Sequence, residues 1–144
     1  MEWFNVFGLV FIAVIMIPNI VFALRCKDGF ANNWENKTVE FLEQIGRFGC
    51  FGFMVFNIPG TWFGWPSDEA FAVYLAVNSL LTVLYCMTWL ICWKKKSLFR
   101  ALALSVIPAV LFLFSGIISR SILLTGAAFI FAPAHILISC KNAV

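Results

Sequence analysis

The chain has 144 residues, of which 62% are hydrophobic and 12% are charged, and its formal net charge is +3. Its mean hydropathy of +0.95 means more apolar surface than a soluble domain of this length can bury, so we expect an integral membrane protein with an all-α, single-domain fold. The small positive charge gives no reason to expect nucleic-acid binding, because the basic residues border the apolar runs and mark membrane orientation instead.

Five apolar runs are long enough to cross a bilayer as helices. They cover residues 3–24, 41–63, 70–93, 98–118 and 122–140. The first run is expected to be a retained helix rather than a cleaved signal peptide, because no basic residue precedes it. Trp62 and Trp65, at the end of the second run, predict an aromatic belt at a membrane boundary.

The second run is distinguished by an acid and a guanidinium within its apolar pattern. On a helix, one polar stripe would contain Glu40, Glu43, Arg47, Cys50, Met54 and Asn57. Lipid cannot hydrogen-bond, so this stripe must face protein or water. Glu43 lies one turn before Arg47, which is the favoured order for a helical ion pair. The stripe is either a packing seam with one ion pair or a polar pocket lined by Glu43, Arg47 and Asn57. The opposite side is expected to face lipid and contains Phe41, Phe48, Phe51, Val55 and Phe56.

Three glycines lie beside the polar stripe. Gly46, Gly49 and Gly52 remove side-chain bulk, which predicts that another helix packs closely against them. This face is expected to dock a second copy or another membrane protein, in which case the chain is a non-catalytic accessory or immunity-type subunit. If the face is internal, the third run is its expected neighbour, because Asn57 and Asn78 both lie roughly 20 Å from the same boundary.

Basic residues are divided unevenly between the two sides of a five-span chain. Of the ten Lys and Arg residues, only Arg120 falls on the side where the chain begins. The other nine fall on the opposite side, including Lys94, Lys95 and Lys96 directly after the third run. Because Lys and Arg concentrate in cytoplasmic segments, we expect the N-terminus outside the cell and the C-terminus in the cytoplasm.

Polar residues of several runs are expected at similar depth. Asn19, Arg47 and His135 each lie about five residues from the cytoplasmic end of their run, which corresponds to roughly 7 Å. Tyr85 lies on the same inner side. Together with Glu43, these residues predict a shallow cytoplasm-facing cavity that binds or transports a small polar or ionic solute.

The sequence contains no motif that indicates a reaction. Its five cysteines have no CxxC or metal-binding spacing, and it has one histidine, so we expect no metal or cofactor. It has no phosphate-binding loop, no GxSxG and no dinucleotide fingerprint. We expect a protein that is not an enzyme; a membrane-embedded enzyme remains open only through Glu43, Tyr85 and His135 as acid–base groups.

The stretches IPNIVFAL (17–24) and EQIGRFGCFGFMVFNIP (43–59) resemble segments of small bacterial multi-span membrane proteins of uncharacterised function. They cover under a third of the chain. The resemblance implies a place in a bacterial inner membrane, and it supplies neither an activity nor a functional residue.

Overall fold

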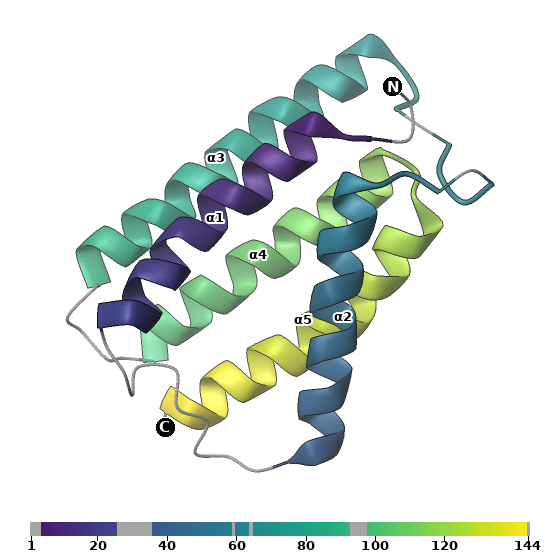
Figure 1. The fold of residues 1–144 in the computed structure, drawn as a ribbon. Helices are drawn as coiled ribbons and strands as arrows, with labels where there is room; N and C mark the ends of the chain where they lie inside the picture. The colour runs from purple at the N-terminus through teal and green to yellow at the C-terminus, as the bar shows by residue number, and fades with distance from the viewer. Residues whose placement is uncertain (1–3, 26–35, 59, 64, 93–97, 144) are drawn as a thin grey trace.

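The protein is a bundle of five helices. The computed structural model describes residues 4–25, 36–58, 60–63, 65–92 and 98–143. The helices are α1 (Val6–Arg25), α2 (Lys37–Val55), α3 (Asp68–Cys92), α4 (Leu98–Ile118) and α5 (Ile122–Ala143). Successive helices run in opposite directions (Figure 1), so the bundle has two ends.

The two ends differ in charge among the described residues. At the acidic end, where α1, α3 and α5 begin, the first turn of α3 exposes Asp68 and Glu69. At the opposite end, where these helices finish, the charged residues at the helix termini are Arg25, Lys37, Arg100 and Lys141, together with the acidic Glu40 in the first turn of α2, so that basic residues are in excess and this is called the basic end. The predicted basic cluster of Lys94, Lys95 and Lys96 lies outside the described residues. It falls in the sequence between the end of α3 and the start of α4.

The second helix is shorter than the apolar run that predicted it. α2 ends at Val55, and Phe56 has extended backbone angles (φ −110°, ψ 122°) and forms an antiparallel bridge with Phe4. The Val55 carbonyl accepts a hydrogen bond from the Asn5 amide at 2.7 Å instead of continuing the helix. The predicted helical range 41–63 is therefore too long, and Asn57 does not lie on α2. Apolarity alone does not distinguish the end of a helix from an extended apolar segment.

α5 is packed against α2 and α4, and α4 also packs against α3. α1 contacts α3 and α2, and α2 also touches α4. Within the described residues, no contact joins α2 to α3, so the third run is not the neighbour of the glycine face. The largest fully buried side chains include Tyr74, Phe112, Met54 and Leu111.

Phe51 does not face outward as the sequence predicted. Its ring is partly buried and lies 5.8 Å from the ring of Phe112 on α4. Val55, also expected to face lipid, is 8% exposed. By contrast, Phe41 and Phe48 are 64% and 65% exposed. Because α2 touches α1 and α4 as well as α5, its buried arc is wider than the single seam predicted from the polar stripe.

At the acidic end, the segment between α2 and α3 is hydrogen-bonded to the turn between α4 and α5. The Ile122 amide donates to the Thr61 carbonyl at 2.9 Å, and the Phe63 amide donates to the Arg120 carbonyl at 3.2 Å. Arg120 has a left-handed backbone (φ 54°), and its Nη2 donates to the Phe63 carbonyl at 2.8 Å. These bonds fix the α2–α3 segment onto the turn between α4 and α5.

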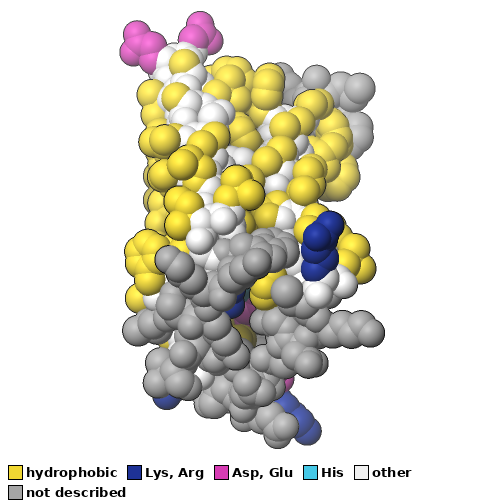
Figure 2. All heavy atoms as spheres, turned by 90° about the vertical axis from the view of Figure 1, so that its left-hand side faces the viewer, with side chains coloured by type: hydrophobic (Ala, Val, Ile, Leu, Met, Phe, Trp, Pro, Cys, Tyr) yellow, Lys and Arg dark blue, Asp and Glu magenta, His cyan; other side chains and the backbone are white. Residues whose placement is uncertain are grey.

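Hydrophobic side chains cover much of the outer flank of the bundle (Figure 2). Leu90 is 80% exposed, Leu24 is 77% exposed and Phe99 is 69% exposed. Among the described residues, three helical segments are long and apolar enough to cross a membrane: Asp68–Cys92, Phe99–Ile118 and Ile122–Lys141. Val6–Phe22 is a shorter apolar stretch, and α2 carries the charged residues Glu40, Glu43 and Arg47. The fold is therefore all-α, with three helices compatible with a membrane.

Candidate functional site

Glu43 and Arg47 form an ion pair on α2. Arg47 Nη2 donates to Glu43 Oε2 across one helical turn, with the acid nearer the helix N-terminus. The Glu43 side chain is 6% exposed, whereas the Arg47 side chain is 40% exposed. Of the five N–H donors of a guanidinium, the structure shows one on Glu43. Arg47 Nε is buried and makes no hydrogen bond to another described residue.

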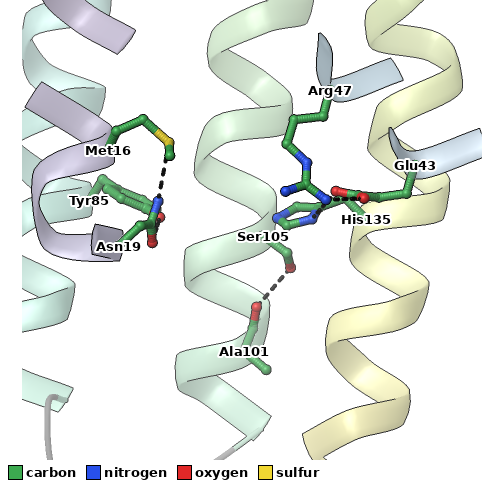
Figure 3. A network of polar contacts seen from close by, with 8 residues as sticks. All are labelled: Met16, Asn19, Glu43, Arg47, Tyr85, Ala101, Ser105 and His135. Atoms are coloured by element: carbon green, nitrogen blue, oxygen red, sulfur yellow. Dashed lines mark hydrogen bonds and ion pairs between the residues drawn. The ribbon is translucent and has the colours of Figure 1, made fainter. Parts of the chain in front are cut away.

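His135 brings α5 into the same cluster. Its Nδ1 lies 3.4 Å from Glu43 Oε1, so the carboxylate contacts one basic group on its own helix and one on the facing helix (Figure 3). The imidazole is stacked on Phe131, one turn earlier on α5, with ring centroids 4.6 Å apart and planes 17° apart. Nδ1 is the ring nitrogen that faces Glu43, which leaves Nε2 as the other polar atom of the ring. The His135 side chain is 28% exposed.

The register of α2 against α5 explains why His135 reaches Glu43. A Cβ on Gly46 would lie 2.6 Å from both Cα and N of Phe131, so only glycine allows this approach of the two backbones. A Cβ on Gly49 would lie 3.0 Å from the Cβ of Ala127, one turn farther along the antiparallel pair. One turn in the other direction, the same register places His135 beside Glu43. A Cβ on Gly52 would meet nothing within 4 Å.

Two of the three predicted packing glycines thus lie against α5 of the same chain. A partner helix that used Gly46 and Gly49 would have to displace α5. The interaction with a second copy or another membrane protein stays a prediction, and these two positions give it no support.

Asn19 and Tyr85 form a separate pair. Tyr85 Oη donates to Asn19 Oδ1 at 2.7 Å, and Asn19 Nδ2 donates to the Ile15 carbonyl at 3.4 Å. Figure 3 shows this pair on the α1 and α3 side of α4, away from the cluster of Glu43, Arg47 and His135. Tyr85 is 3% exposed. Tyr85 therefore lies apart from Glu43 and His135, the two residues with which it was considered as a possible set of acid–base groups.

Asn78 and Asn57 lie in different surroundings. Asn78 is fully buried and donates through Nδ2 to Ser115 Oγ on α4 at 2.9 Å, not to Asn57, which the sequence placed at a similar depth. Its Oδ1 makes no hydrogen bond to a described residue. Asn57 is 9% exposed and lines a pocket at the acidic end.

Sequence reasoning missed two polar residues. Ser115 on α4 pairs with Asn78, and Asn5 at the start of α1 donates through Nδ2 to the hydroxyl of Tyr74 at 2.9 Å. An asparagine or serine inside an apolar run is the signal that indicates such pairs, because a buried amide or hydroxyl needs a partner. The signal does not identify the partner.

No cluster of three or more His, Cys, Asp or Glu side chains suited to a metal ion occurs in the part of the chain that the structure describes. No protein-family model matches the sequence, and no curated protein or solved structure is significantly similar to it. The fold and the surface define the class of protein: an all-helical bundle with three helices able to cross a membrane.

Proposed function

We propose that the chain is a multi-pass membrane protein whose five helices all cross the bilayer, with the N-terminus outside and the C-terminus in the cytoplasm. α2 has 19 residues and extends about 28 Å, close to the about 30 Å of a hydrocarbon core. Its buried acid is covered by α5 rather than exposed to lipid, which is how membrane helices tolerate ionised groups. The basic end then faces the cytoplasm, in agreement with the positive-inside rule. The resemblance to bacterial membrane proteins favours the inner membrane.

We further propose that Glu43, Arg47 and His135 bind a small polar or ionic solute, which the protein transports or retains. The observation that carries this proposal is the exposure of the three side chains. The carboxylate is 6% exposed, while its two basic partners are 40% and 28% exposed. Part of each basic side chain is therefore left uncovered by protein, and the buried carboxylate fixes the positions of both. Such pre-organisation reduces the entropy lost when a solute binds.

The two basic side chains have complementary roles. Arg47 has guanidinium N–H groups beyond the one that it directs to Glu43, and these can bind acceptor atoms of a solute. His135 directs Nδ1 to the carboxylate, so Nε2 is left for a hydrogen bond with the solute. The site therefore suits a solute with at least one hydrogen-bond acceptor. The proposed binding involves no covalent step and uses only Glu43, Arg47 and His135.

The histidine offers a direct test, because His135 is the only histidine in the chain. Diethyl pyrocarbonate modifies accessible imidazoles, so its reaction rate with the purified protein reports on one site. Small carboxylates, inorganic phosphate, chloride, monosaccharides and amino acids would be screened for those that slow modification. We expect one class to protect His135 in the unmodified chain and to lose this effect in Arg47→Gln.

Glu40→Gln is the matched control, because it removes a carboxylate from the same helix one turn before Glu43. It should leave the protection unchanged. If no solute slows the modification, or if protection survives in Arg47→Gln, the solute site is refuted. Counterflow of the protecting solute in proteoliposomes then separates transport from binding alone.

A further inference from the structure

The acidic end of the bundle contains an open pocket of about 420 Å³. Its lining comes from two stretches that are far apart in the sequence, 4–7 and 57–71, and includes Phe4, Phe7, Asn57, Trp62, Trp65 and Phe71. The volume lies within the roughly 300–1,000 Å³ typical of small-molecule sites. The pocket shares no residue with the cluster of Glu43, Arg47 and His135, so it is a second candidate site at the other end of the bundle.

Aromatic rings form most of the pocket wall. Trp65 is central among them: its ring lies 5.9 Å from Trp62, 4.7 Å from Phe71 and 5.2 Å from Tyr74. The pairs with Trp62 and Phe71 are edge-to-face, and so is the pair of Phe7 with Phe71 at 5.6 Å. Rings turned against one another in this way present π faces in several directions, as in the aromatic cages that hold quaternary ammonium groups.

The charge beside this pocket is negative. A neighbouring hollow of about 490 Å³ shares Trp65 and Phe71 with the pocket and is also lined by Asp68. Asp68 and Glu69 are both exposed in the first turn of α3. Arg120, the basic residue described at this end, donates through Nη2 to the Phe63 carbonyl. Two carboxylates beside aromatic walls favour a cation over an anion.

We propose that the pocket binds an organic ammonium group, held among the rings around Trp65 and attracted by Asp68 and Glu69. The shared chemistry is an alkylated nitrogen cation with apolar substituents. It can come from a free organic cation such as choline or from the choline headgroup of a phospholipid. The rings contact the apolar substituents, and the π faces and carboxylates stabilise the charge.

The test compares choline with its uncharged isostere 3,3-dimethylbutanol on the unmodified full chain in maltoside micelles. Tryptophan fluorescence and the melting temperature would be followed during titration. We expect choline to bind saturably and the isostere to bind about tenfold more weakly, because only the cation gains the π and carboxylate attraction. Equal binding of the two compounds, or no saturable choline binding, would overturn the proposal.

Variants test the two parts of the site separately. Trp65→Leu should weaken choline binding by about tenfold, whereas Trp65→Phe, which keeps a π face, should retain most of it. The double change Asp68→Asn and Glu69→Gln should weaken binding several-fold at low salt and less at high salt. Glu40→Gln, near the basic end, should have no effect. If Trp65→Leu folds and binds choline like the unmodified chain, the aromatic site is refuted.

Nanodiscs distinguish the two sources of the cation. In phosphatidylglycerol discs, added choline should give the saturable signal seen in micelles. If phosphatidylcholine discs abolish that signal and raise the melting temperature of the unmodified chain but not of Trp65→Leu, the headgroup occupies the pocket. If choline titrates equally in both kinds of disc, the pocket takes the free cation. Absence of a signal in both kinds of disc would overturn the proposal for the membrane-embedded protein.

Discussion

The close approach of α2 and α5 at Gly46 leads to a quantitative prediction. In Gly46→Ala, the new Cβ would lie 2.6 Å from Cα and N of Phe131 and 2.7 Å from its Cβ. Carbon atoms in contact are normally about 3.5–4.0 Å apart, so the backbones must separate by about 1 Å. Overpacking of this kind costs about 1–3 kcal/mol, which a gain of up to about 1 kcal/mol in helix propensity partly offsets. We expect a net loss of about 1–2 kcal/mol.

The other two glycines are matched controls on the same helix. A Cβ on Gly49 would be 3.0 Å from the side-chain Cβ of Ala127, so Gly49→Ala should cost less than Gly46→Ala. A Cβ on Gly52 would meet nothing within 4 Å, so Gly52→Ala should be neutral or stabilising by up to about 1 kcal/mol. The free energy of unfolding would be measured by reversible titration of mixed micelles with SDS, followed by circular dichroism.

The same substitution should also affect the solute site. His135 Nδ1 lies 3.4 Å from Glu43 Oε1, near the limit of a hydrogen bond, so a further separation of about 1 Å breaks the contact. His135 should then react faster with diethyl pyrocarbonate in Gly46→Ala than in Gly52→Ala. If Gly46→Ala is as stable as Gly52→Ala and His135 reacts at the same rate in both, the close register of α2 and α5 is wrong.

Three further predictions concern the ion pair, the second polar pair and the topology. Glu43→Gln and Arg47→Gln should each be less stable than the double variant. The difference should lie between the about 1 kcal/mol of exposed ion pairs and the about 3–5 kcal/mol of buried ones. Additive losses in a double-mutant cycle would show that the residues do not interact. Tyr85→Phe removes a 2.7 Å bond to Asn19 from a buried site and should cost about 1–3 kcal/mol in micelle unfolding; an unchanged stability would contradict that bond. A fluorescent reporter fused after Val144 should be active only in the cytoplasm, and activity of a periplasmic reporter there would refute the five-span topology.

The helices could be predicted from the sequence because apolar runs and their polar borders are local features. The expected fourth run, 98–118, has the bounds of α4, and α5 begins at residue 122 as expected. The end of α2 could not be predicted in this way. The chain leaves the helix after Val55, where the Asn5 amide bonds to the Val55 carbonyl and Phe4 pairs with Phe56, and this segment before α1 is remote in sequence. Such tertiary contacts override a local apolar pattern.

The site illustrates the same distinction between local and long-range information. The pair of Glu43 and Arg47 could be predicted from the sequence because both residues lie on one helix, four positions apart. The depth argument placed Arg47 and His135 at a similar level, but it did not join them. It also grouped Asn19 and Tyr85 with them, although these two lie on the other side of α4 (Figure 3). The position of a residue along its helix gives its depth in the bundle. Which residues it contacts at that depth depends on which helices are neighbours.

The neighbours themselves depend on the glycines of α2. An ionised carboxylate that faces lipid is costly, so in the proposed five-span topology Glu43 requires a partner helix that covers it. The contact at Gly46 provides this cover, because it brings the backbone of α5 close enough for Phe131 to pack there and for His135 to reach the acid. The packing seam between α2 and α5 and the proposed solute site therefore share this contact. A substitution at Gly46 should therefore reduce stability and solute binding together, whereas one at Arg47 can reduce solute binding and leave the contact between the two helices intact.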